Sequence, residues 1–185
     1  ANGNGMGVTM SSCVAAADWI DPSREIASYP VLQGVLLSSH KSCHGEGNWY
    51  HQKGTHHFHF SLTSHQEGWK NGYQFGVEAN RPLYACQKTN DTGVLSSAQS
   101  FLRVSDSLVG VSVIKKSDEG NSLIVRLVEM EGKDKEVELT LPQRVKEVVR
   151  TNLIEEEEER LGLSGKTLCL KMGHHAIETF KLILE

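Results

Sequence analysis

The sequence predicts an all-β protein built from antiparallel β-sandwiches, on two observations. First, short segments rich in Val, Ile and Leu fill the second half, and tight polar turns separate them; these segments are 108–114, 123–130, 135–141, 166–172 and 176–184. Second, apolar and polar residues alternate strictly in 136–141, which is typical of a strand with one buried and one wet face. The gaps are too short for the crossover segments, of about a dozen residues or more, that parallel strands require.

The first half predicts strands over 8–14, 31–37 and 55–62. In the last of these, Phe58, Phe60 and Leu62 recur at every second position, so one face is expected to be buried. His57 and His59 project from the other face. Helical periodicity is scarce, and no helix is predicted in this half.

Three further segments complete the expected organisation. Residues 145–153 show helical spacing, but their Val and Thr content favours a strand. The five glutamates of 155–159 repel one another and predict a solvated turn. Residues 84–100 lose periodicity and are polar, which predicts a linker or long loop and a domain boundary near residue 100. We therefore expect two domains, 1–99 and 100–185.

Composition limits the possible partners. The formal charge is −4, and no basic stripe interleaves with aromatics, so a nucleic-acid partner is not expected. No apolar run reaches the ~20 residues that span a bilayer, so no membrane partner is expected. The four cysteines are widely separated, so we interpret them as free, small apolar residues. Compartment stays undetermined. The chain opens with Asn and Gly residues and no initiator Met, so we expect a longer parent chain.

Histidine is the first candidate for site chemistry. Seven of the nine histidines fall between positions 40 and 65, and His57 with His59 could hold zinc if a third ligand approached. No fixed-spacing metal motif is present, so the simpler interpretation is a polar sheet face. Asp18 and Asp21 form an acidic pair, but at this spacing they are interpreted as turn residues. No catalytic residue is assigned.

Aromatic side chains are the second candidate. Trp49, Tyr50 and Trp69 lie near glycine-rich turns, where rings can stand exposed and stack on sugars. The alternative is packing in a core or between domains, where aromatic area dominates burial. Taken alone, these residues support a β-sandwich with a possible carbohydrate-binding site.

Several short sequence motifs, taken in order along the chain, resemble motifs in the carboxy-terminal region of bacterial-type family 38 glycoside hydrolases, which are α-mannosidases. Residues 54–65 fit that family's G-x-H-x-F-x-F-x-L-x-x-H pattern. The step at 79–83, the phrase at 111–129 ending in R-L-V-E, and segments 137–142, 152–155 and 176–182 follow in the same order. Nearly the whole chain is covered.

The resemblance implies a fold for this chain and places the catalytic residues in another domain. Residues 1–99 would be the end of a mutarotase-like β-sandwich, and 100–185 a small C-terminal β-sandwich. The family hydrolyses terminal α-mannosides with retention, using an aspartate nucleophile and a zinc ion, but those residues lie in an amino-terminal domain. No position here matches them, so no cofactor is expected in this chain itself. The implied partners are that catalytic domain and, through it, mannose-containing oligosaccharides.

Three functional hypotheses follow. The first is an accessory region, inactive alone, that packs against the catalytic domain. The second is a free-standing carbohydrate-binding module with Trp49, Tyr50 and Trp69 as its stacking platform. The third is an independent zinc enzyme using His57 and His59.

Overall fold

The chain forms two compact units, residues 1–89 and 90–185, hereafter the N-terminal and C-terminal units. The computed structural model describes residues 2–3, 5–14, 16–17, 31–37, 51–81, 83–87, 93, 96–118, 120–141 and 145–185. The sequence placed the boundary near residue 100. Within the predicted loop 84–100, the described residues contain no helix or strand. Among all described residues, no helix combines the length and apolar character needed to cross a membrane.

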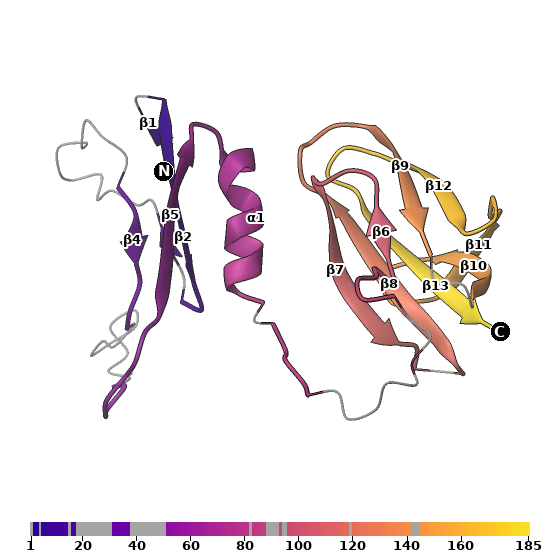
Figure 1. Ribbon diagram of the computed structural model, residues 1–185, viewed down its shortest axis with the longest axis horizontal. Coiled ribbons are helices and arrows are strands. Elements are labelled where there is room, and N and C mark those ends of the chain that lie inside the picture. The colour runs from indigo at the N-terminus through magenta and orange to yellow at the C-terminus, as the bar shows by residue number, and fades with distance from the viewer. Residues whose placement is uncertain are drawn as a thin grey trace, which may run out of the picture. The chain divides into compact units, whose positions relative to one another are not determined.

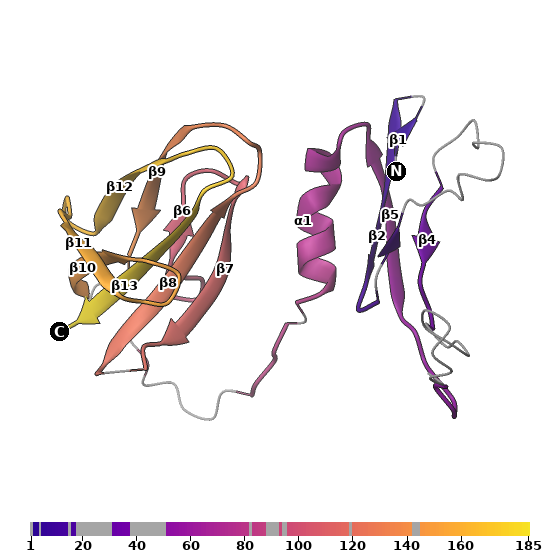
Figure 2. The ribbon, with the colours of Figure 1, turned by 180° about the vertical axis from the view of Figure 1, so that it is seen from behind.

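The N-terminal unit contains a three-stranded antiparallel sheet, a helix and a two-stranded pair (Figures 1 and 2). The sheet has the order β1 (Asn2–Gly3), β2 (Met6–Ser12), β5 (Phe60–Gln66). Helix α1 (Trp69–Ala79) follows β5 directly. The pair consists of β3 (Ala16–Ala17) and β4 (Gln33–Gly34). In both views, α1 lies on one side of β2 and β5, and β4 lies on the other.

Helix α1 is the exception in a mostly β chain, and the sequence predicted no helix in this half. Its interior contains Gly72 and Gly76, each about 1 kcal/mol less favourable than Ala in a helix. No side chain caps its start at Gly68. The helix exists because it packs on the sheet: Gly72 is buried, and a Cβ at this position would collide with Thr9 and His65. Tertiary packing therefore overrides a weak local preference.

The sheet beneath α1 presents its polar face to the helix. Thr9 and Ser11 of β2, with His65 of β5, share this face, and the Ser11 hydroxyl donates to the Gly76 carbonyl at 3.0 Å. The opposite face, on the side of β4, is apolar and partly exposed; Gly34 of β4 approaches the Phe60 ring so closely that a Cβ there would lie 2.9 Å from it. The exposed fractions on this face are 57% for Met6, 37% for Val8, 39% for Phe60 and 64% for Leu62.

Two strand predictions in this unit need correction. The predicted strand 55–62 begins only at Phe60, and residues 51–59 form no helix or strand. The face expected to be buried is exposed at Leu62, because the covering helix sits on the other side. Of 31–37, only Gln33–Gly34 is a strand, whereas 8–14 is confirmed in large part as β2.

The C-terminal unit is an antiparallel sandwich of two sheets. The larger sheet has the order β11-β10-β13-β8-β7, and the smaller has the order β12-β9-β6. The bounds are β6 Arg103–Val104, β7 Val109–Lys116, β8 Ser122–Glu129, β9 Lys135–Thr140, β10 Val145–Thr151, β11 Glu157–Leu161, β12 Thr167–Met172 and β13 Ile177–Leu184. Both sheets contribute to one core, which includes Val125, Leu139, Leu168, Phe180 and Leu182.

The sequence predictions for this unit are largely confirmed. The five predicted strands correspond to β7, β8, β9, β12 and β13, and the stretch at 145–153 contains a strand, β10. The acidic run is the exception, since Glu157 to Glu159 belong to strand β11 rather than to a turn. This strand lies at the sheet edge with exposed side chains, and Arg150 and Lys181 pair with Glu159 and Glu157. Edge position and counter-charges therefore relieve the repulsion.

Candidate functional site

The structure separates the predicted site residues. Trp49, Tyr50, Asp18 and Asp21 lie outside the described residues. His57 and His59 are exposed in the irregular segment before β5. Within the described part of the chain, no group of three or more His, Cys, Asp or Glu side chains is placed to hold a metal ion.

The cysteines behave differently from expectation. Cys13, Cys86 and Cys169 are free, but all three are exposed rather than packed as small apolar residues. Cys43 lies outside the described residues.

Trp69 lies at the start of α1, beside a cleft of about 550 Å³. The helix contributes Tyr73 and Val77 to this cleft, and Asn80 and Arg81 follow at its end. The sheet contributes Val8, Thr9 and His65. Of the predicted stacking residues, only Trp69 is placed here, and the sequence analysis missed the others that line the cleft. The i, i+4 spacing of Trp69 and Tyr73 was the available signal.

The two aromatic rings of the cleft meet edge to face. Their centroids are 6.0 Å apart and their planes are inclined by 86°. Trp69 is 46% exposed, so part of its indole faces solvent. A half-exposed indole beside polar groups is an arrangement that could stack on a sugar ring.

His65, the last residue of the family-like pattern, uses both ring nitrogens. Its Nδ1 lies 2.7 Å from the Gln66 carbonyl, and its Nε2 lies 2.9 Å from the Thr9 hydroxyl. Because a carbonyl only accepts, Nδ1 carries the proton and Nε2 accepts from Thr9. This pairing fixes the ring beneath Gly72, so His65 holds the helix–sheet contact.

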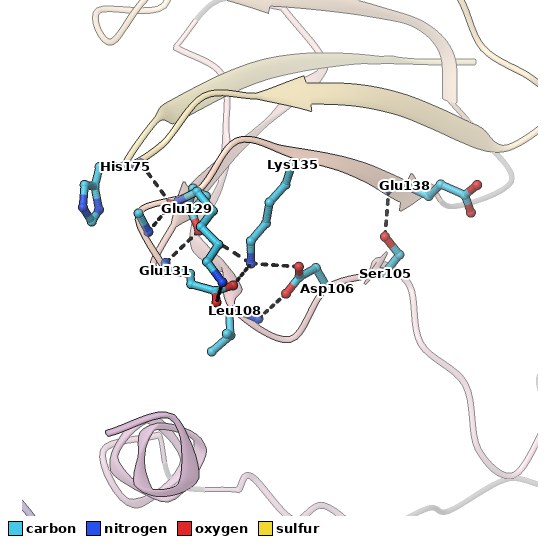
Figure 3. A network of polar contacts seen from close by, with 10 residues as sticks. Ser105, Asp106, Leu108, Glu129, Glu131, Lys135, Glu138 and His175 are labelled. Atoms are coloured by element: carbon cyan, nitrogen blue, oxygen red, sulfur yellow. Dashed lines mark hydrogen bonds and ion pairs between the residues drawn. The ribbon is translucent and has the colours of Figure 1, made fainter. Parts of the chain in front are cut away.

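The second polar cluster surrounds Glu129 in the C-terminal unit (Figure 3). Glu129 ends β8 and is 1% exposed. Its carboxylate accepts four backbone N–H groups: Glu131 at 2.7 Å, Gly132 at 2.7 Å, Lys133 at 3.2 Å and His175 at 3.0 Å. The carboxylate therefore joins the β8–β9 turn to the β12–β13 turn.

Lys135 extends this cluster to a third turn. Its ammonium lies 3.6 Å from the Glu129 carboxylate, 3.0 Å from Glu131 and 2.8 Å from Asp106. Asp106 also accepts the Leu108 N–H at 2.7 Å, which closes the β6–β7 turn. The hydrogen bond from Lys135 lowers the pKa of Asp106. Burial would lower the pKa of Lys135, but Asp106 and Glu131 outweigh it and leave that pKa raised.

The protonation state of Glu129 defines what this cluster can do. Burial would raise the pKa of Glu129, but the backbone N–H groups, His175 first, lower it to about 2. A glycosidase acid needs the opposite, a pKa raised toward the working pH. Glu129 therefore stays ionised and fully paired, and the cluster ties turns together.

Arg126 has a comparable role on the other face of β8. Its Nε donates to the Thr179 hydroxyl and its terminal nitrogen to the Leu153 carbonyl, both at 2.9 Å. Arg126 and Glu129 are the two charged residues of the R-L-V-E phrase. Both hold loops to the sandwich, which gives a structural reason for their presence in that phrase.

The architecture and contacts of the C-terminal unit define an antiparallel β-sandwich domain whose charged residues tie its turns together. Comparison with protein families then assigns it: residues 108–180 match the glycosyl hydrolases family 38 C-terminal beta sandwich domain. No curated protein matches the chain.

Proposed function

We propose that this chain is the non-catalytic carboxy-terminal region of a family 38 α-mannosidase, and that it packs against and supports the catalytic domain. The match of residues 108–180 to the family's C-terminal sandwich carries the proposal, because such domains are usually part of a larger α-mannosidase. The parent enzyme would hydrolyse terminal α-mannosides of oligosaccharides.

The N-terminal unit supports this role through its apolar sheet face. Met6, Phe60 and Leu62 expose apolar area to water. Each Å² of this area that a partner buried would stabilise the assembly by about 25 cal/mol. A neighbouring β layer of the parent enzyme would bury that area. We propose that the remainder of a mutarotase-like sandwich, joined to the catalytic domain, covers this face.

The zinc ion that the family implies would belong to the parent's amino-terminal domain. The described residues offer no cluster of ligands for it. No catalytic step is therefore assigned to them, and their proposed contribution is to position and stabilise the domain that performs hydrolysis.

A direct assay tests the proposal. Purified chain is expected to release no product from an aryl α-mannoside, with or without added zinc. Turnover that co-purifies with the chain would contradict the accessory role.

A Leu62→Asp variant tests the docking face. In the chain alone, Leu62 is 64% exposed, so the change should shift the unfolding midpoint little. In the intact enzyme the same aspartate would be buried, so activity and thermal stability should both fall. Equal tolerance in both contexts would show that this face is not covered.

A second candidate function rests on Trp69 beside its cleft. A carbohydrate-binding module would give measurable heat with mannose oligosaccharides, and Trp69→Ala would abolish it. Tyr84→Ala is the matched control, because Tyr84 is 96% exposed and does not line the cleft. No heat from the unmodified chain would remove this function.

A further inference from the structure

We propose that Leu153 and Ile154 form a docking tip for the amino-terminal part of the same enzyme. They lie in the β10–β11 loop, residues 152–156, of the C-terminal unit. This inference rests on the proposed function and identifies which surface of the sandwich makes the contact. The partner would present an apolar recess bordered by Lys or Arg side chains.

The loop is built around Asn152. Its side-chain oxygen accepts the backbone N–H groups of Ile154 at 3.1 Å and Glu156 at 3.0 Å. Its side-chain nitrogen donates to the Glu156 carboxylate at 2.8 Å. Its carbonyl accepts the Glu155 N–H at 3.1 Å. One residue thus fixes both arms of the loop and pushes the two apolar side chains to its tip.

The loop is also fastened to the sheet. Glu155, at a left-handed φ of 71°, pairs with Lys115 of β7 at 2.7 Å. Arg126 of β8 holds the Leu153 carbonyl. Lys181 of β13 pairs with Glu157, where β11 begins, at 2.8 Å. Contacts to three strands make the loop a fixed part of the surface, and a fixed surface loses little conformational entropy when it binds.

The tip itself stays open to solvent. Leu153 is 57% exposed. Ile154 is 75% exposed, which is the highest value for a large apolar side chain in the described part of the C-terminal unit. A rigid group of aliphatic side chains with a polar border is the composition of a protein contact.

The side chains that surround the tip are mostly acidic, and their charge favours a basic protein surface as the partner. Glu156 is exposed beside the tip, and both Glu156 and Asp118 line, with Ile154, a cleft of about 530 Å³. A second copy meeting tip to tip would bring like charges together, and an anionic membrane would repel them. A protein recess with basic side chains at its edge complements both the charge and the apolar tip.

The test uses the amino-terminal part of the enzyme, made separately, as the probe for this chain. Calorimetry should detect binding to the unmodified chain. The double variant Leu153→Ser, Ile154→Ser should bind at least about tenfold more weakly, since central apolar contacts dominate interface energetics. Ile114→Ser is the control: Ile114 is 59% exposed on β7, and its variant should bind within about twofold of the unmodified chain.

Two further readouts separate docking from folding. The double variant should keep its unfolding midpoint, because both side chains are already largely exposed. Hydrogen exchange at 152–156 should slow when the probe is added. Asp118→Asn should slow association, because the Asp118 side chain is 89% exposed at the border of the tip, and salt should reduce the difference.

The outcomes distinguish failure of the docking-tip proposal from failure of the proposed accessory function. Equal binding by the double variant would overturn the tip and leave the accessory role intact. No binding by the unmodified chain would overturn both. A dimer of the chain alone that the double variant dissociates would overturn the proposed partner in favour of a second copy.

Discussion

Glu129 shows how a single side chain can look solvated in the sequence and be buried in the fold. It precedes the polar turn Glu131–Gly132–Lys133, so its position in the sequence alone suggests a solvent-exposed residue at the end of a strand. Three of its four backbone donors are local, but the fourth comes from His175, 46 positions later. A contact of that separation depends on the sandwich topology, so local pattern could not reveal it.

Removing the charge of Glu129 should destabilise the C-terminal unit. Glu129→Gln keeps the shape of the side chain but puts an NH₂ group where backbone N–H donors converge, so two donors oppose each other. Urea unfolding should show a lower midpoint. Glu136→Gln is the control, because the Glu136 and Lys171 side chains are 82% and 88% exposed and their 3.7 Å pair contributes little. Equal midpoints for the two variants would contradict the role of Glu129.

The same carboxylate predicts a pH dependence. Its pKa is about 2 in the folded chain against an ordinary value of 4.5. The stabilisation it provides is therefore complete above pH 4.5 and is lost as the pH falls toward 2, because the unfolded chain binds the proton first. Unfolding midpoints measured across this window should fall more steeply for the unmodified chain than for Glu129→Gln. Parallel curves would show that the pKa is not lowered.

At the scale of elements, strands were predicted better than the helix. Strands β7 to β10 and β12 to β13 are rich in β-branched and aliphatic residues, and the sandwich buries the face that their patterns indicate. Strand β11 was missed because glutamates are rare in strands, and its edge position is a tertiary property. Helix α1 was missed because its two glycines lower helix propensity, while the packing that requires them involves distant residues.

The two glycines of α1 give a matched pair of variants. Gly72→Ala should destabilise the N-terminal unit by about 1–3 kcal/mol, because the new methyl group collides with Thr9 and His65. Gly76→Ala meets only Thr9 Cγ2 at 3.7 Å, an ordinary contact. It should be neutral or stabilising by up to about 1 kcal/mol. Hydrogen exchange across 69–79 measures both, and equal effects would refute the packing argument.

For the whole molecule, the sequence predicted two domains and the family of the second, but not how complete each one is. The C-terminal unit surrounds its own apolar core. The N-terminal unit instead exposes the side of its sheet that carries Met6 and Leu62. Alternation in β5 identified two faces correctly, yet which face is covered depends on the layers stacked on it. The candidate cleft at Trp69 depends on the same unpredicted helix.

The two units should unfold at different denaturant concentrations. All three Trp and all four Tyr residues fall within 1–89, so intrinsic fluorescence reports the N-terminal unit alone. Far-ultraviolet circular dichroism reports both units. Because Met6 and Leu62 of the N-terminal sheet stay exposed whereas the C-terminal unit buries a core, the fluorescence transition should come at lower urea. Superimposable transitions would indicate that the chain unfolds as one cooperative body.

Strand β11 ends the larger sheet with a row of glutamates, and this affects how molecules meet one another. A free strand edge offers backbone groups to any extended chain that comes near. At β11, an added strand would lie alongside the carboxylates of residues 157 to 159. These carboxylates would lose hydration while the backbone gained hydrogen bonds. Growth of the sheet into neighbouring molecules is thus discouraged at this border, and concentrated solutions should resist fibril formation from that side.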